Sequence, residues 1–257
     1  MLRALYTGST GMETEQKRLD VISNNLANAT TVGYKKEGVT SQSFDDVLAL
    51  KVRDESAMLT DSKIGTMSLG VKIGEVYTDY SQGSLRETGN TYDLAIEGNG
   101  FFAVETTDSK GNTSTRYTRA GQFMMNQEGY IVDSQGNYLM GESGRLKVDT
   151  TAGEVLINVD GSVYADGELV DKVTVKDFTD YNYLKKGAGT MYEAIAGANE
   201  KEVSGLVRQG FTEQSNVSVV SEMVSMISIS RAYEANQKVI QSVDSTLELA
   251  VSSVGKI

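Results

Sequence analysis

Hydrophobic residues recur at a strict seven-residue spacing near the end of the chain. Val219, Met226, Tyr233, Ile240, Leu247 and Val254 form one series, and a second series follows three residues later with Glu222, Ile229, Asn236, Val243, Ala250 and Ile257. Two series of this kind mark the a and d positions of a coiled-coil heptad. They predict a single helix over residues 211–257, more than about 60 Å long at about 1.5 Å per residue, and a helix of this length needs a partner.

A weaker form of the same pattern occupies the beginning of the chain. Leu5, Met12, Leu19 and Leu26 fall seven residues apart, whereas the companion series of Gly8, Glu15, Ile22 and Ala29 is only half apolar. We expect a helix over residues 1–30, within an N-terminal segment 1–36, with Gly33 as its stop signal. Its apolar stripe is narrow.

Matching stripes at the two ends predict that the terminal helices pair. They can do so within one chain, as a helical hairpin, or between neighbouring subunits; the sequence pattern leaves both arrangements open. In either case the stripe residues are the candidate assembly interface. They are Leu5, Met12, Leu19, Ile22, Asn24, Asn25, Leu26 and Asn28 in the first helix, with Val219, Met226, Ile229, Tyr233, Asn236, Ile240, Val243, Leu247 and Val254 in the last.

The middle of the chain has the sequence pattern of a β domain. Short apolar runs alternate with turn dipeptides such as Asn99-Gly100, which we expect to close a hairpin. Asp160-Gly161 and Asp166-Gly167 should bracket one short strand, Ser162–Ala165. We therefore predict an antiparallel β domain over residues 68–205, reached through an extended connector over 37–67 with one helical turn around residues 44–50. The expected fold class is α+β.

Composition narrows the chemistry. The 257-residue chain has no Cys and no His, which excludes a Ser-His-Asp triad, a Cys-His pair and His- or Cys-based zinc sites. A net charge of −11 argues against nucleic-acid binding, which needs clustered Lys and Arg. What remains for an enzyme is carboxylate, Lys or Tyr chemistry, so a carboxylate-dependent glycosidase is the rival hypothesis, weakened by the absence of Trp to stack on sugar.

Two motifs could indicate ligands, and each has a plainer explanation. Gly98, Gly100 and Ala103 match the spacing of a dinucleotide-binding motif, but Phe101 to Val104 predicts a strand where that motif needs a helix. The acidic cluster of Asp160, Asp166, Glu168 and Asp171 lacks the spacing of a calcium-binding loop and is typical of a solvated hairpin. We expect no cofactor, no metal and no small-molecule substrate. The N-terminus shows neither a signal peptide nor a membrane span.

Four blocks of sequence resemble the flagellar rod and hook protein family. They are LDVISNNLANATTVGYKK at residues 19–36, DLAIEGNGFFAV at 93–104, YTRAGQFMMNQEG at 117–129 and SNVSVVSEMVSMISISRAYEANQKVI at 215–240. Their order matches that of the family and they span nearly the whole chain. The length is closer to rod members than to hook members, with the distal rod members nearest and the proximal ones next.

The resemblance implies a function. It indicates a non-enzymatic structural subunit of the rod in the basal body, outside the cytoplasmic membrane, polymerising with copies of itself and with other rod and hook proteins through coiled terminal helices. It also implies export by the flagellar type III apparatus. Asn24, Asn25 and Asn28 either fray the first helix or, as the resemblance favours, form side-chain hydrogen bonds between subunits. A proximal rod or hook-type protein is the nearest alternative, and a surface adhesin anchored by helical ends is a more distant one.

Overall fold

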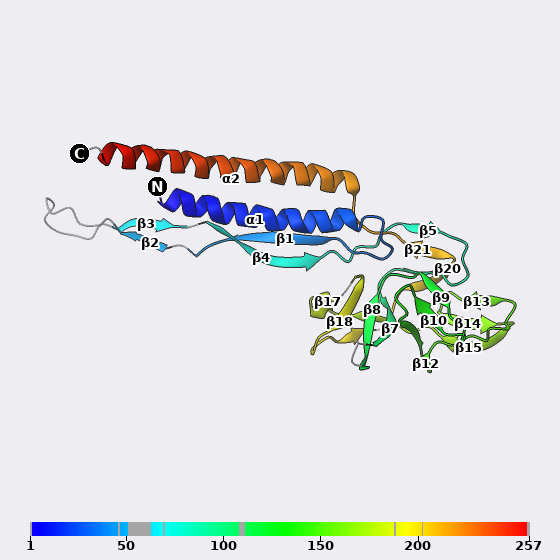
Figure 1. Ribbon diagram of the computed structural model, residues 1–257. Coiled ribbons are helices and arrows are strands. Elements are labelled where there is room, and N and C mark those ends of the chain that lie inside the picture. Colours follow the sequence, from blue (N-terminus) through cyan, green and yellow to red (C-terminus); the bar gives the residue numbers. More distant parts are fainter. Residues whose placement is uncertain are drawn as a thin grey trace. The chain divides into compact units, whose positions relative to one another are not determined.

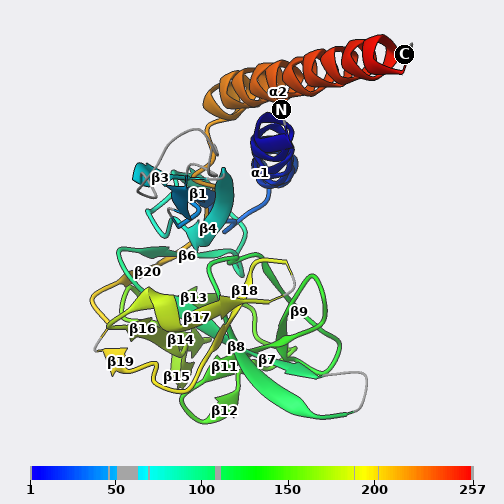
Figure 2. The same cartoon turned by 90° about the vertical axis from the view of Figure 1, so that its left-hand side faces the viewer.

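The computed structural model describes residues 2–45, 47–50, 63–68, 70–107, 111–187, 189–201 and 203–255 (Figures 1 and 2). The chain divides into two compact units. The helical unit comprises residues 1–27, 37–79 and 218–257, and the β unit comprises residues 28–36 and 80–217. Within the described residues, neither helix is long and apolar enough to cross a membrane.

In the residues that the structure describes, the helical unit contains two helices and two β ribbons. Helix α1 spans Leu2–Ala27 and α2 spans Val219–Val254. Strand β1 (Glu37–Ser43) pairs antiparallel with β4 (Val71–Thr78), and β2 (Val47–Leu50) pairs antiparallel with β3 (Lys63–Met67). In Figure 1 the helices run side by side in opposite directions, and α1 packs against both α2 and the β1–β4 ribbon.

The heptad pattern correctly identifies α2 and its inward face. Along the described a and d positions, every residue from Glu222 to Ala250 is buried or half-buried, whereas most other positions of the helix are exposed. The helix begins at the first residue of the heptad series, after Ser218 in an extended conformation. It does not extend back to residue 211 as expected, because Phe211–Glu213 forms strand β21 and pairs with β5.

Residues 37–79 differ from the expected connector. Because β1 pairs with β4, residues 68–79 belong to the helical unit and not to the β domain in which the sequence analysis placed them. No helical turn forms around residues 44–50 in the part of this stretch that the structure describes, since Val47–Leu50 is a strand. Strand β1 is separated in sequence from its partner β4, and β2 from its partner β3. The local hydrophobic pattern therefore does not indicate either pairing.

The β unit is built from antiparallel pairs, as predicted. Its largest sheet has the order β17-β18-β8-β7-β11-β10-β9, with β12, β16 and β19 branching from it, and β13-β14-β15 form a three-stranded meander. The remaining pairs are β20 with β6 and β21 with β5. The bounds are β5 Leu85–Glu87, β6 Leu94–Glu97, β7 Phe101–Thr107, β8 Thr113–Thr118, β9 Phe123–Met125, β10 Ile131–Asp133, β11 Tyr138–Gly141, β12 Gly144–Arg145, β13 Val155–Ile157, β14 Ser162–Ala165, β15 Glu168–Lys172, β16 Val175–Phe178, β17 Leu184–Lys186, β18 Met191–Ala194, β19 Glu200–Lys201, β20 Leu206–Gln209 and β21 Phe211–Glu213.

Two turn predictions have opposite outcomes. Strand β14 has the predicted bounds, and Asp166 and Gly167 both adopt positive φ, as a tight hairpin turn after it requires. The Asn99-Gly100 prediction is wrong, because β6 pairs with β20 while the following strand β7 pairs with β8, β11 and β16. The chain therefore changes sheets at this turn instead of folding back on itself.

The β unit has two adjoining cores. The larger one is aliphatic and contains the buried side chains of Leu94, Ile96, Phe102, Val104, Phe123, Ile131, Leu139, Leu146, Val148, Ile157, Val163, Val173, Met191 and Val207. The smaller one is aromatic. It holds Phe101, Phe178, Leu184 and Tyr192, with Tyr80, Tyr117 and Tyr181 packed against it.

Tyr181 makes the aromatic core sensitive to alkaline pH. Its hydroxyl donates a 2.7 Å hydrogen bond to Oδ1 of Asp177, and burial together with this carboxylate raises the pKa of Tyr181 from 10.0 to about 12. The folded state therefore holds the phenol proton more tightly than the unfolded state does. The resulting stability is present below pH 10 and is lost as the pH rises toward 12.

We predict that the unfolding free energy of the Tyr181→Phe variant will decrease less between pH 10 and pH 12 than that of wild type. The difference should be on the order of 1–2 kcal/mol, reduced from the full linkage value because the side chain is partly exposed. Urea unfolding of wild type and variant across the pH window would measure it. Tyr183→Phe is the control, since Tyr183 is 44% exposed. Parallel curves for wild type and Tyr181→Phe would contradict the prediction.

Candidate functional site: the seam between the terminal helices

Helices α1 and α2 meet at glycines. A Cβ atom built on Gly8 would lie 3.1 Å from Cγ1 of Ile240, and one built on Gly11 would lie 2.9 Å from Nδ2 of Asn236. Larger side chains at these glycines would have to displace the Ile240 side chain or the Asn236 amide, or else move the helices apart. Because Gly8 faces the later residue of α2 and Gly11 the earlier one, the pairing is antiparallel, as Figure 1 shows.

A buried side-chain amide, that of Asn25, lies at the other end of the seam. Asn25 is fully buried, and its Nδ2 donates to the Glu37 carbonyl at 2.8 Å and to Oε2 of Glu222 at 3.4 Å. Its Oδ1 accepts from the Glu37 backbone N–H at 3.0 Å. Both ends of the amide are thus used inside the chain, joining the last turn of α1 to β1 and to the first turn of α2.

The structure brings most of the predicted interface residues to this seam region, with different degrees of burial. Asn25 and Ile229 are buried, whereas Leu5, Asn24 and Val219 are exposed. Asn28 lies beyond α1, in the β unit, where its Oδ1 accepts from the Thr31 hydroxyl at 3.2 Å. Val254 is the last residue of α2, and its side chain is not among those that the structure describes. The half-buried members are Met12, Leu19, Ile22, Leu26, Met226, Tyr233, Asn236, Ile240, Val243 and Leu247.

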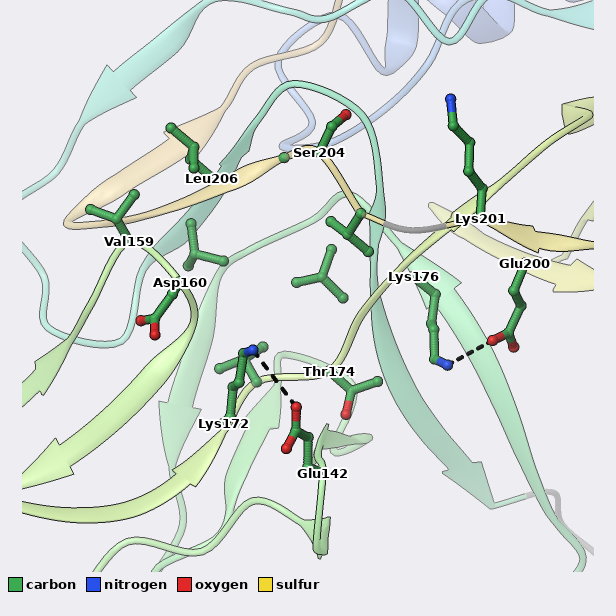
Figure 3. A pocket seen from close by; sticks show the side chains of 15 residues that line it. Glu142, Val159, Asp160, Lys172, Thr174, Lys176, Glu200, Lys201, Ser204 and Leu206 are labelled. Carbon is green, nitrogen blue, oxygen red and sulfur yellow. Dashed lines mark hydrogen bonds and ion pairs between the residues drawn. The ribbon is translucent and has the colours of Figure 1, made fainter.

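A separate groove of about 760 Å³ lies in the β unit (Figure 3). Valines form much of its lining, and charged side chains stand around it. Nζ of Lys176 lies 2.6 Å from Oε2 of Glu200, and Nζ of Lys172 lies 3.8 Å from Oε1 of Glu142. The hydrogen bond to Glu200 raises the pKa of Lys176, which is the opposite of what a lysine nucleophile requires.

Three family profiles match successive parts of the chain. The profile of the flagella basal body rod protein covers residues 5–35, that of the flagellar hook protein FlgE/F/G D1 domain covers residues 95–165, and that of the flagellar basal body rod FlgEFG protein C-terminal region covers residues 208–252. The first and last include much of the helical seam, and the middle one lies in the β unit.

Whole-length relatives agree with the profiles. The flagellar basal-body rod protein FlgG of Bacillus subtilis is 33% identical over 98% of this chain and 99% of its own length. The chain belongs to the flagellar basal-body rod family. Two further members are FlgG of Agrobacterium fabrum, 32% identical over 95% of this chain and 96% of its own length, and FlgF of Caulobacter vibrioides, 32% identical over 100% and 98%.

Membership of the rod family settles the broad function. The protein is a structural subunit of the flagellar rod, located in the basal body that spans the cell envelope, and it is most like the distal rod members, FlgG. The resemblance found in the four sequence blocks is confirmed. The rod function holds over the glycosidase and adhesin alternatives.

Four residues that contribute to the packing of α1 are absent from the interface expected from sequence. Gly8 counted as a gap in an apolar stripe and Gly11 lies outside both heptad series, although both come close to α2. Glu222 is a buried partner of Asn25 at a d position. Thr14 is buried on α1, and its hydroxyl lies 3.3 Å from the Val71 carbonyl, linking the helix to β4.

We predict that Gly11→Leu will separate the helices although it removes a poor helix former. The new side chain would occupy the space of Asn236, and overpacking of this kind costs roughly 1–3 kcal/mol. Thermal melting of dilute protein, followed by far-ultraviolet circular dichroism, should show helical signal lost at lower temperature. Ser9→Leu, at an exposed position of the same helix, is the control. Equal melting of the two variants would argue against a glycine-dependent seam.

Proposed function

We propose that this rod subunit polymerises with copies of itself through its terminal helices, and that α2 carries the contact surface. The helix has a second apolar stripe besides the one at the seam. Val220, Met223, Val224 and Ile227 follow the i, i+3, i+4, i+7 spacing of one helix face and are 73%, 49%, 62% and 54% exposed. A clustered apolar face of this kind favours a protein contact.

The unequal lengths of the helices support the same proposal. Helix α1 has 26 residues and α2 has 36, and in Figure 1 the C-terminal turns of α2 extend past the start of α1. Leu249 and Val251 in this part are 68% and 71% exposed. Helices of neighbouring subunits would cover these side chains, and a staggered arrangement would repeat the contact along a filament.

The interface proposed from sequence divides into two parts in this scheme. The half-buried a and d residues, such as Ile240 and Tyr233, hold α1 against α2 within a subunit. The exposed residues, such as Val219 and Leu5, join the second stripe in facing neighbours. Both arrangements left open by the sequence pattern are then used, each by a different face of α2.

Family membership supports a proposal for the partners and the export route. Relatives are named as rod proteins and, in one case, as the hook-basal body complex protein FlhO of Bacillus subtilis. We infer that other rod and hook proteins contact this subunit at the ends of its own segment of the rod. Passage through the flagellar type III export apparatus as an unfolded chain is in keeping with a sequence free of Cys, which forms no disulfide.

We also propose that the protein catalyses nothing. Glu142 and Glu200 at the β-unit groove are each held by a lysine, whereas a glycosidase needs one carboxyl group kept protonated as an acid. Incubating the protein with peptidoglycan and following release of soluble fragments would test this. Release that persists in a Glu200→Gln variant would point to a contaminant, and release abolished by that variant would contradict the proposal.

The assembly proposal predicts a specific effect of changing the second stripe. The double variant Val224→Ser, Ile227→Ser should keep its helical content, since both side chains point to solvent in the subunit, but assembly should be lost or strongly weakened. In the proposed contact a neighbouring subunit would bury both side chains. Replacing them should therefore reduce the association free energy by about 1.5–3 kcal/mol for each side chain at every interface. Sedimentation velocity over a concentration series would measure assembly.

Gln237→Ser with Gln241→Ser is the matched control on the same helix, because both glutamines are exposed and polar. This control should assemble as wild type does. Normal assembly of the Val224→Ser, Ile227→Ser protein would show that the second stripe is not the contact.

A further inference from the structure

Three stretches of the chain meet around one buried carboxylate in the β unit. Glu213 is fully buried, and its Oε1 lies 2.6 Å from Nζ of Lys35 while its Oε2 lies 3.1 Å from Nη1 of Arg119. Both cations are almost completely buried as well. The backbone N–H of Gly83 donates a further 2.9 Å hydrogen bond to Oε1. A carboxylate with two buried cations and a backbone donor is well satisfied.

Neighbouring hydrogen bonds tie the same stretches together without using charge pairs. Gly33 donates its N–H to the Glu213 carbonyl at 2.8 Å, and Lys36 donates its N–H to Oδ1 of Asn216 at 2.7 Å. Nζ of Lys35 also donates to the Ser81 carbonyl at 2.8 Å, to which Nδ2 of Asn216 donates at 3.2 Å. We refer to residues 33–36, 81–83, 119 and 213–216 as the Glu213 junction.

The junction lies where the chain passes between the units. Residues 33–36 lie between α1 and β1, residues 81–83 follow β4, and residues 213–216 lead into α2. Three of the four points at which the chain passes from one unit to the other, 36/37, 79/80 and 217/218, therefore lie within a few residues of the junction. The backbone fits closely there, since Gly33 has a φ of +69° and a Cβ atom on it would lie 2.2 Å from the Ala120 nitrogen.

The three charges come from three separate parts of the family pattern. Lys35 lies in the rod protein match, Arg119 in the D1 match and Glu213 in the C-terminal match. The parts that these profiles describe separately thus supply one charged group each to a common cluster.

We propose that the Glu213 junction is a positioning device for assembly, an inference that rests on the proposed helix-mediated polymerisation. It fixes the segment that follows the end of α1 and the segment that precedes the start of α2 to each other through contacts of the β unit alone. The two helices then reach a neighbouring subunit as a pair, and less conformational freedom is lost on binding than with two independent tails. Lys35, Asn216 and Glu213 are positioning residues in this scheme.

One of the three charged residues, Lys35, can be replaced so that the junction is weakened and no buried charge loses its partner. Removing Glu213 would leave two buried cations unpaired, which is strongly destabilising. Removing Lys35 leaves the Arg119–Glu213 pair and the Gly83 bond in place, and Met fills much of the volume of the lysine stem. Lys35→Met should therefore release residues 33–36 while the β unit stays folded.

The test uses the full chain and two measurements. Hydrogen–deuterium exchange of dilute monomer reports whether residues 33–36 are held, and sedimentation reports the concentration needed for assembly. In Lys35→Met we expect exchange at the Gly33 amide to rise about tenfold or more, in line with loss of a charge-assisted hydrogen bond, and the critical concentration to rise by a similar factor. Amides of β7 should exchange as in wild type. The control Lys185→Met, at an exposed lysine of the same unit, should change neither quantity.

A second variant covers the case in which Lys35→Met unfolds the β unit. Asn216→Ala removes the bonds to Lys36 and Ser81 and leaves every charge in place, so faster exchange at the Lys36 amide with poorer assembly would support the proposal. Wild-type exchange in both variants, or released segments with unchanged critical concentration, would overturn it.

Failure of the proposed function would look different. Normal assembly of the Val224→Ser, Ile227→Ser protein would contradict the helix contact, whatever the junction variants do. Loss of assembly in that protein beside normal assembly of Lys35→Met and Asn216→Ala would contradict the junction alone.

Discussion

A buried charge has to be neutralised where it lies, and this requirement organises the connections of the molecule. Glu213 cannot leave the interior of the β unit without stranding Lys35 and Arg119, and those two side chains cannot leave without Glu213. Apolar packing tolerates many combinations of side chains of similar volume, whereas an ion cluster needs particular groups at particular positions. The passages between the units are therefore defined by specific side chains, while the sheets beside them are held mainly by general burial.

The sequence was most informative where structure is local and regular. The existence and inward face of α2 and the bounds of β14 follow from the sequence, because a seven-residue repeat and an Asp-Gly turn act within a few residues. The β1–β4 ribbon was missed because strand partners so far apart leave no periodic trace. Strand β21 was assigned to the helix because Phe211 to Glu213 contains no helix breaker, and only pairing with β5 decides its conformation.

The candidate site was foreseen in outline and misjudged in detail for one physical reason. A heptad pattern depends only on which positions are hydrophobic. The seam depends in addition on residues with small side chains and on hydrogen bonds between buried polar side chains. Gly8 therefore weakened the predicted stripe and Gly11 fell outside it, although both lie close to side chains of α2. Glu222 weakened it too, although it is a partner of Asn25. The residues of the Glu213 junction belong to no periodic series at all, and only the fold brings them together.

The two faces of α2 separate folding from assembly. Contacts at Gly8 and Gly11 use up one face inside the subunit, so the helix is already partly ordered before any neighbour arrives. The face bearing Val224 and Ile227 gains nothing from folding, because it stays in water until another protein covers it. A helix with only the first face would give a soluble monomer, and a helix with only the second would depend on neighbours for all its order. In the proposed assembly, having both faces would allow a subunit to be stable alone and still favour addition to a growing structure.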